Sequence, residues 1–532
     1  MAKKRFSAID HAWLRLDEPS NLMIITGLMT FDKALDVDYF KFLVEKNLLH
    51  FDRFRQKITN SHLPFLPPYW EDDEDFNINH HIEHITLPEP GDQKALQETI
   101  SVLMSTGLDY DKPLWKFYIV DEYNGGSALI ARLHHCIADG IALMYVLLSM
   151  TSTEPDVAWP EPTLESSGKP QEDALGERLM QLRKLMENAS ESRKKILDEI
   201  SRLSNDQKYR RERAQSAMGI AGAAAKLVLR WPDPKTAYKG PLGISKRAAW
   251  SDPLALDDIK MIGKVNGGTV NDVLMTLVAG ALSRYLSYLG EPVDELEIRG
   301  FIPINIRPLN LASELGNKFS IVFLSLPLGI QDSLQRLNQV KRNMDALKAS
   351  PEAIAAYGIL TILGVVPYKI QNIGIQIFDT KGSAVMTNVP GPRMQLYMAG
   401  APVNTVMAWV PQSGRIGLGV SILSYNGKVW LGLATDEGLV PDPERILGFF
   451  CDEFSDLMSR SENIQANKIQ PIKPMISELE SSLQVVDALL AEYQQPEILE
   501  IPLCQGTTKS GNPCKNRALA GESYCRVHLK VG

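Results

Sequence analysis

The sequence predicts a mixed α/β protein made of two successive α/β regions and a small Cys/His tail. Strand and helix patterns alternate over residues 1–170 and again over residues 245–460. Between them, residues 171–244 form a charged helical linker. A second linker with one helix, residues 461–502, leads to the tail at 503–532, which holds three of the five cysteines.

The composition is that of an ordinary globular protein. The chain has 532 residues, 44% of them hydrophobic and 23% charged, which excludes a collagen, a wholly disordered chain and a small disulfide scaffold. The net charge is −8. Because a nucleic-acid footprint needs a basic face, we do not expect nucleic acid as a partner.

The first region reads as a series of strands and helices. An apolar stretch from 21 to 31 predicts a strand, and apolar residues at helical spacing predict a helix over 94–108. Two strands, 115–120 and 128–133, are joined by a turn at Asn124-Gly125-Gly126. An apolar helix follows over 141–150.

The charged linker shows apolar residues at +3 and +4 steps over 172–213, which predicts an amphipathic helix or helix pair with a solvated face. The second region predicts one helix at its start, one at its end, and five strands. The helices cover 270–289 and 443–457, and the strands cover 296–303, 319–326, 383–387, 415–423 and 429–435. A last helix is expected over 475–493.

The N-terminus predicts no secretory signal, because charged residues interrupt the apolar run that should follow its basic residues. We therefore expect a cytoplasmic protein. Two apolar segments, 214–231 and 353–368, are too short and too broken to span a membrane comfortably. Each is either a buried helix or a surface that contacts lipid.

The segment from Leu133 to Gly140 is the strongest candidate for chemistry. Two adjacent histidines, His134 and His135, follow a predicted strand, and Asp139-Gly140 stands just before a predicted helix. Loops between strand and helix can aim side chains into a cleft, and histidine is the usual general base. The structural alternative is a packed histidine pair with Asp139 as a helix cap. A metal site is less favoured, because no third ligand stands at suitable spacing.

These residues resemble the His-His-x-x-x-Asp-Gly motif of the CoA-dependent acyltransferase superfamily. More closely, the chain resembles the bacterial-type wax ester synthase/acyl-CoA:diacylglycerol acyltransferases over about residues 7–457. The resemblance rests on several motifs in the family's order: Phe6 to Asp10, Pro113-Leu114-Trp115, Val270 to Val273, Pro303 to Arg307, Leu315-Gly316-Asn317 and Thr387 to Pro392.

The resemblance implies a pseudo-symmetric pair of acyltransferase-like domains with a channel between them. It implies that His135 is the general base and that the alcohol attacks the acyl-CoA thioester directly. Cys136 is then a bystander. No cofactor is implied for the reaction, since acyl-CoA is a substrate.

The resemblance also gives expectations for residues around the histidines. Asp139 is implied to hold the loop through a salt bridge to an arginine, for which Arg307 is the candidate. Asn271 and Asp272 either order the site or simply cap a helix. Asn388 either lines the channel and steadies an oxyanion or belongs to a rigid turn.

The acceptor implied by the resemblance is diacylglycerol or a long-chain alcohol. Such a substrate is dissolved in lipid, so we expect peripheral contact with a membrane or a lipid inclusion. Two alternatives stay open: another acceptor within the same superfamily, or an acyl-CoA-binding scaffold that has lost catalysis.

The tail offers a complete set of metal ligands. Cys504, Cys514, Cys525 and His528 match a tetrahedral Cys₃His zinc site. The tail has too few apolar residues to hold a core, so a metal would have to supply folding energy. A disordered cysteine tail is the alternative. Four protein ligands leave no open position, so zinc there would be structural.

Overall fold

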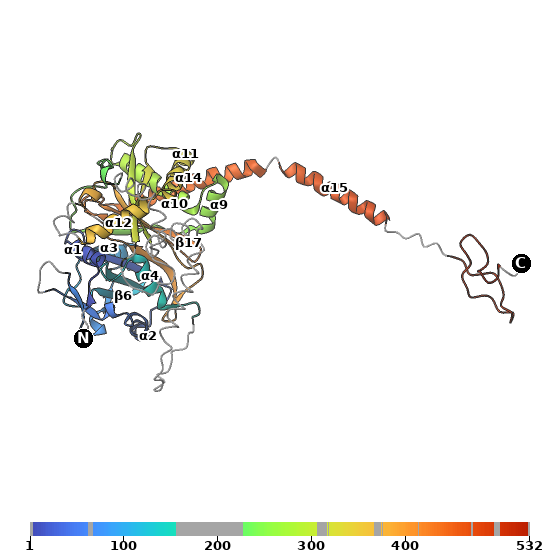
Figure 1. Cartoon of the computed structure of the whole chain (residues 1–532), viewed down its shortest axis with the longest axis horizontal. Coiled ribbons are helices and arrows are strands. Elements are labelled where there is room, and N and C mark those ends of the chain that lie inside the picture. Colours follow the sequence, from blue (N-terminus) through green and yellow to red (C-terminus); the bar gives the residue numbers. More distant parts are fainter. Residues whose placement is uncertain are drawn as a thin grey trace, which may run out of the picture. The chain divides into compact units, whose positions relative to one another are not determined.

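The structure is a computed structural model that describes residues 4–61, 67–155, 227–305, 317, 319–365, 374, 376–412, 414–469, 472–493 and 501–529. The chain divides into two units, Met1–Glu462 and Asn463–Gly532. Within the first unit, the N-terminal half and the C-terminal half each form a layered α/β structure around a seven-stranded mixed sheet (Figure 1). This confirms the predicted α/β fold with two halves.

The N-terminal sheet has the strand order β5-β6-β7-β2-β15-β14-β8. Its strands are β2 (Ile24–Phe31), β5 (Ile82–Thr86), β6 (Trp115–Tyr123), β7 (Gly126–His134), β8 (Thr151–Ser152), β14 (Tyr397–Met398) and β15 (Ala401–Trp409). The helices of this half are α1 (Ala8–Arg15), α2 (Val37–Leu43), α3 (Gln93–Met104) and α4 (Gly140–Ser149). A small sheet of order β1-β4-β3 joins β1 (Lys4–Arg5), β4 (Tyr69–Asp72) and β3 (Gln56–Thr59).

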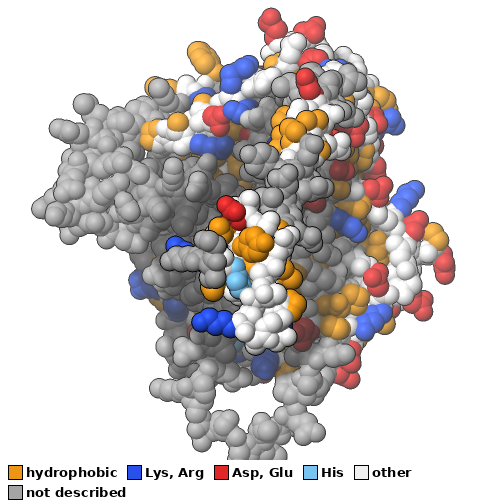
Figure 2. Space-filling model, turned by 90° about the vertical axis from the view of Figure 1, so that its right-hand side faces the viewer, with side chains coloured by type: hydrophobic (Ala, Val, Ile, Leu, Met, Phe, Trp, Pro, Cys, Tyr) orange, Lys and Arg blue, Asp and Glu red, His pale blue; other side chains and the backbone are white. Residues whose placement is uncertain are grey.

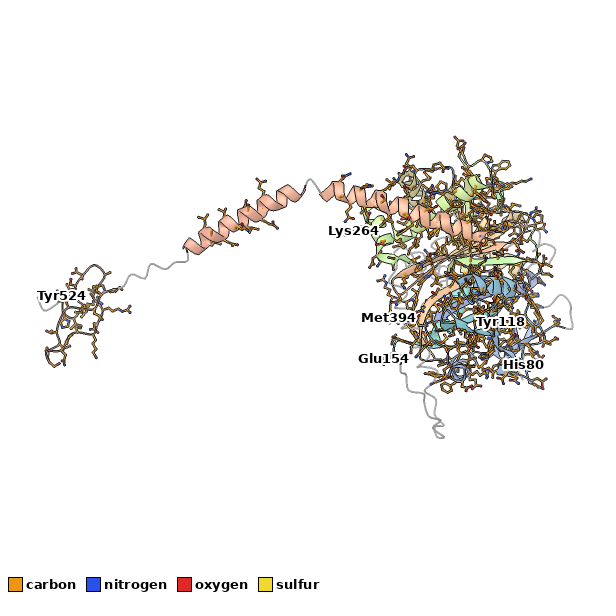
Figure 3. The ribbon with its side chains drawn as sticks, turned by 180° about the vertical axis from the view of Figure 1, so that it is seen from behind. His80, Tyr118, Glu154, Lys264, Met394 and Tyr524 are labelled. Carbon is orange, nitrogen blue, oxygen red and sulfur yellow. The ribbon has the colours of Figure 1, made fainter. Side chains whose placement is uncertain are left out.

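Two strands of this sheet come from the C-terminal part of the chain. β15 pairs antiparallel with β2, with Trp409 opposite Thr26 and Val403 opposite Phe31. β14 continues the sheet and pairs with β8 at its edge, where Glu154 and Met394 lie close by (Figure 3). The predicted division at residues 171–244 therefore does not separate the two sheets, a point that the sequence pattern did not indicate.

The C-terminal sheet has the order β10-β17-β16-β13-β11-β12, with β9 pairing β17. Its strands are β9 (Lys246–Trp250), β10 (Leu254–Ala255), β11 (Glu297–Asn305), β12 (Phe319–Pro327), β13 (Ala384–Pro390), β16 (Leu418–Tyr425) and β17 (Lys428–Asp436). Its helices are α9 (Leu256–Asn266), α10 (Val270–Tyr288), α11 (Ser333–Lys348), α12 (Glu352–Val365) and α14 (Pro443–Ile469).

The two halves share a hairpin with the same turn sequence. Tyr123-Asn124-Gly125 joins β6 to β7, and Tyr425-Asn426-Gly427 joins β16 to β17. In both turns the asparagine and the glycine have positive φ, as a two-residue type I′ turn requires. In both halves the second strand of the hairpin then leads to a helix, α4 or α14.

The predicted strands and helices are present where the structure describes them, with shifted ends. The last helix of the second region is longer than expected, because α14 continues to Ile469. The charged segment 172–213 lies outside the described residues. Residues 353–365 of the apolar segment 353–368 belong to α12, where Ala353, Ala355 and Ala356 are buried. Of the apolar segment 214–231, only the last five residues are described.

The second unit holds α15 (Ile472–Tyr493), where the sequence predicts a helix, and the tail, which consists of turns and isolated bridges around Tyr524 (Figure 3). Among the described helices, none combines the length and the apolar content needed to cross a membrane. On the face of the molecule in Figure 2, acidic and basic side chains are interspersed.

Candidate functional site

The two histidines lie where a buried strand of the N-terminal sheet turns into a helix. β7 ends at His134, and α4 begins at Gly140. Asp139 is the N-cap of α4, and its carboxylate accepts a hydrogen bond from Ala142 N at 2.9 Å. This cap fixes the start of α4. It therefore also fixes the C-terminal end of the loop that carries His135.

His135 lines a cavity between the two halves and is held by aromatic rings. Its imidazole stacks on Trp13 of α1 with a centroid distance of 4.2 Å, and Phe319 packs at 5.8 Å. Burial lowers the pKa of His135 to about 4, although the charge of Asp139 works in the opposite direction. At neutral pH the ring is therefore uncharged and able to accept a proton.

The imidazole of His134 lies outside that cavity and contacts Asp17 and Tyr110. Its Nδ1 accepts a hydrogen bond from Cys136 N at 3.1 Å, so Nε2 carries the proton. Nε2 lies 3.5 Å from Asp17 Oδ1 and 3.3 Å from the Tyr110 hydroxyl, which itself donates to Asp17. His134 is not among the residues that line the cavity beside His135.

The loop after His134 is clamped through its backbone carbonyls. Asn317 Nδ2 donates to His135 O at 2.8 Å, and Arg53 Nη1 donates to Cys136 O at 3.2 Å and Ile137 O at 2.5 Å. The buried carboxylate of Asp10 joins the two donors, accepting from Arg53 at 2.9 Å and from Asn317 at 2.8 Å. Three consecutive carbonyls are thus held by one ionic cluster.

The cavity beside His135 has a volume of about 220 Å³ and is largely apolar. Its walls come from both halves: α1 and α4 on one side, and β11, β12, β13 and β16 on the other. The apolar lining includes Ile9, Met144, Phe301, Ile321, Val385 and Leu423. Such a lining suits an alkyl chain, and the imidazole of His135 is one of a few polar groups on the wall of the cavity.

Of the two asparagines expected near the site, Asn388 lines the cavity, and Asn271 contacts Asn388 without lining it. Asn388 Nδ2 donates to Asn271 Oδ1 at 2.8 Å. Asp272 does not reach the cavity; it forms a capping box with Thr269 at the start of α10, which is the structural alternative considered for it.

Arg307 lies outside the described residues, so its expected contact with Asp139 stays a prediction. An arginine does hold the loop in the structure, but it is Arg53 and it acts on carbonyls. Cys136 is fully buried, and burial raises the pKa of its thiol well above the usual value, which makes it a poor nucleophile.

Several site residues carry no local sequence signal. Asp10 and Asn317 belong to motifs that match the resembling family, but nothing in these motifs indicates a hydrogen bond between residues 307 positions apart. Trp13, Asp17, Arg53 and Tyr110 join the histidines only through the tertiary fold.

In the tail, the four predicted ligands lie together. The ligand atoms of Cys504, Cys514, Cys525 and His528 all lie within 4.8 Å of one another. Cys514 Sγ is 3.9 Å from Cys525 Sγ, and His528 Nδ1 is 3.3 Å from Cys504 Sγ. These spacings are close to the edges of a zinc tetrahedron, about 3.8 Å between sulfurs at a Zn–S bond of about 2.3 Å.

The histidine of this cluster is also oriented as a ligand. His528 Nε2 lies 2.9 Å from Thr507 O, so it donates to that carbonyl and leaves Nδ1 free to face the thiols. The three cysteines are themselves a buried cluster of the tail. The residues present therefore fit a tetrahedral metal ion.

The comparison with known proteins covers both halves. Residues 6–274 match the wax ester synthase/diacylglycerol acyltransferase catalytic domain, and residues 315–458 match the WS/DGAT C-terminal domain. The chain is 28% identical to the O-acyltransferase WSD of Acinetobacter baylyi, over 86% of this chain and 98% of that protein. It is 25% identical to a provisionally named diacylglycerol O-acyltransferase of Mycobacterium tuberculosis, over 87% and 91%.

Solved structures show the same fold. The wax ester synthase/diacylglycerol acyltransferase of Marinobacter aquaeolei aligns with a TM-score of 0.60 at 20% identity, covering 86% of this chain and all of that one. The first condensation domain of the calcium-dependent antibiotic synthetase aligns with a TM-score of 0.54 at 14% identity, covering 86% of this chain and 98% of that one.

Proposed function

This chain belongs to the wax ester synthase/diacylglycerol acyltransferase family and is an acyl-CoA-dependent O-acyltransferase, and we propose that His135 is its general base. The observation that carries the proposal is the position of a buried imidazole on the wall of an apolar cavity between the halves, where burial lowers its pKa and so favours the uncharged ring. A general base must be unprotonated and within reach of the hydroxyl it activates.

In the proposed reaction, His135 accepts the proton of the acceptor hydroxyl while the oxygen attacks the thioester carbonyl. The C–O bond forms, and the tetrahedral intermediate collapses with cleavage of the C–S bond. The leaving CoA thiolate takes the proton back from His135, so the imidazole ends the cycle uncharged. No bond forms between the acyl group and the protein.

The surrounding residues hold this base in place. Trp13 stacks on the ring, and the cluster of Asp10, Arg53 and Asn317 fixes the backbone of residues 135–137. We propose that His134 with Asp17 and Tyr110 anchors the start of the loop, and that Asp139 anchors its end as the cap of α4. These are positioning residues, because they act through His135.

The test is release of CoA thiol by purified protein given palmitoyl-CoA and either hexadecanol or dipalmitoylglycerol. His135→Ala should lose at least about 1000-fold in kcat, since the attack then lacks its base. His84→Ala is the matched control, because His84 is half-exposed and its ring pairs with Asp121 on the surface. Equal turnover in His135→Ala would remove His135 from the mechanism, and binding of acyl-CoA without turnover in the wild type would favour a scaffold.

We further propose that the tail binds one structural Zn²⁺ through Cys504, Cys514, Cys525 and His528. The ion would supply folding energy to a segment with a minimal apolar core. Metal analysis of the whole chain should give one zinc per chain, and Cys525→Ser should lose it. Cys451→Ser, outside the cluster, should keep it. A metal-free wild type would overturn the proposal.

Peripheral contact with a lipid surface is proposed for the segment 227–231. Trp231 is 85% exposed and Leu229 is 78% exposed, which is unusual for large apolar side chains so close together. Leu229→Ser with Trp231→Ser should reduce sedimentation with dipalmitoylglycerol-containing vesicles. The control is Val102→Ser, an exposed apolar residue on α3. Equal sedimentation of both variants would contradict the proposal.

A further inference from the structure

Helix α15 carries an apolar stripe that is exposed to solvent. Four large side chains, each from 50% to 61% exposed, form this apolar stripe: Leu479, Leu483, Val486 and Leu490. They follow one another along a single continuous helix (Figure 1). Large apolar side chains that gather on one exposed face mark an interaction surface. The matched family domains end at residue 458, so the apolar stripe lies outside them.

The spacing of the apolar stripe is that of a coiled coil. Two series of apolar residues repeat every seven positions, and the offset between the series alternates between four and three residues. Over the whole of α15, the first series is Ile472, Leu479, Val486 and Tyr493, and the second is Ile476, Leu483 and Leu490. A strict seven-residue repeat over three heptads keeps one face of a helix directed at a partner helix. The pattern therefore indicates that another helix covers the apolar stripe.

The charges of α15 disfavour a lipid surface as the occupant. Residues 474–493 contain four acidic residues and no lysine or arginine. A helix that lies on a membrane usually carries basic residues on its polar face, because these residues are attracted to anionic lipids. An acidic helix is repelled by the same lipids, and also by the phosphates of a nucleic acid. A protein helix is therefore the favoured occupant.

The residues beside the apolar stripe indicate how two copies of α15 can pair. With Leu483 at heptad position a, the e positions beside the apolar stripe are Glu480 and Asp487, both acidic. The g positions are Ser482 and Leu489, both uncharged. In a parallel pair, each e position lies beside a g position of the other copy, so no two acidic side chains meet. In an antiparallel pair, the e positions of the two copies lie beside each other, and their like charges repel.

We propose that α15 pairs in parallel with α15 of a second copy of this chain, so that a two-stranded coiled coil makes the protein a homodimer. The same apolar stripe of each copy covers the other, as in any symmetric dimer. This inference depends neither on acyl transfer nor on the metal of the tail. A dimer carries two copies of the lipid contact proposed at 227–231, and two linked contacts hold a lipid surface more tightly than one.

Sedimentation equilibrium of the whole chain measures this association. A reductant is present, so that disulfides between the free cysteines of two copies do not contribute. The wild type should have the mass of two chains of 59.2 kDa at micromolar concentration. Leu483→Gln with Val486→Gln should raise the dissociation constant about 100-fold or more, because it buries amide groups in the apolar stripe of both copies. Val485→Gln is the matched control, since Val485 is the neighbouring valine, 60% exposed, outside the apolar stripe.

A second measurement tests the orientation of the two helices. On oxidation, Val486→Cys should cross-link two copies, because equal d positions meet in a parallel pair, whereas Val485→Cys should give no more cross-linking than the wild type. A dimer that Val486→Cys fails to cross-link would overturn the parallel arrangement.

The mass of the wild type decides whether copies pair at all. A single-chain mass at every concentration, or equal weakening by Val485→Gln, would overturn the inference. If the wild type stayed a single chain and only the double variant lost sedimentation with phosphatidylserine vesicles, the apolar stripe would be a lipid-binding face instead. Both variants should release CoA thiol at the wild-type rate, since α15 lies outside the matched acyltransferase domains.

Discussion

Asn317 donates a hydrogen bond of 2.8 Å to the backbone carbonyl of His135, joining the C-terminal half of the chain to the loop between β7 and α4 of the N-terminal half. The same amide nitrogen reaches Asp10 Oδ1 at 2.8 Å. The position of the His135 imidazole thus depends on both halves, and a shift of one half relative to the other would move this ring.

Asn317→Ala should lower kcat about tenfold, because it releases the carbonyl of His135 and leaves Asp10 without one partner. Loss of a buried hydrogen bond of this kind also destabilises the fold by about 1–3 kcal/mol. Steady-state kinetics and thermal unfolding measure the two effects. Asn343→Ala is the control, because Asn343 makes a comparable 2.9 Å bond to Ser325 O away from the site. A kcat equal to that of the control would contradict a positioning role.

The pH profile of kcat/KM should reflect the low pKa of His135. The base works only when unprotonated, so activity falls as pH falls through its pKa. Since burial lowers that pKa to about 4, activity should stay level between about pH 5 and 7. An acid limb near pH 6.5, the ordinary value for histidine, would show that the ring is solvated in the working enzyme.

Stability should depend on pH for the same reason. A histidine that is uncharged when folded and has a lowered pKa contributes stability that is present above its unfolded pKa of about 6.5. That contribution is lost as pH falls towards the folded value of about 4, by up to about 3 kcal/mol. Urea unfolding of His135→Asn should show a flatter pH dependence than the wild type. A slope remains because burial and Arg15 also lower the pKa of His11 to about 4.

Cys136→Ala should keep most of the activity. The thiol is fully buried, and its raised pKa keeps it protonated. Mass spectrometry of the wild type mixed with palmitoyl-CoA alone should show no acyl group on the chain. An acylated Cys136, or ping-pong kinetics, would replace direct attack by a covalent mechanism.

Removal of metal should affect the tail and spare catalysis. Because the tail belongs to a separate unit, a strong chelator should collapse the amide signals of residues 501–529 without changing the initial rate of acyl transfer. Nuclear magnetic resonance and the thiol-release assay measure the two parts. A parallel loss of activity would show that the tail supports the catalytic unit.

Local patterns were sufficient to predict the strand–turn–helix around His135, because each of its signals lies within a few neighbouring residues. The alternation before His134, the histidine pair and the Asp139 cap are all contained in one short segment. The ligand cluster of the tail could be predicted in the same way. Its four ligands lie within 25 residues of sequence, and such a short segment can bring them together around one ion.

The rest of the site depends on contacts that no local pattern encodes. Arg53 reaches a loop more than 80 residues away, and Trp13 meets His135 only because α1 packs against the cavity. The place of β15 in the N-terminal sheet could not be predicted for a related reason. Its partner β2 lies in the other half of the chain, and the sequence pattern of a strand does not identify the sheet that the strand joins.

The crossing of β15 into the N-terminal sheet means that the halves cannot mature independently. A fragment that ends between them leaves residues 26–31 of β2 as an unpaired edge, with which other copies of the chain can pair. During synthesis, the first half must wait for the ribosome to deliver residues 401–409 before its sheet is complete.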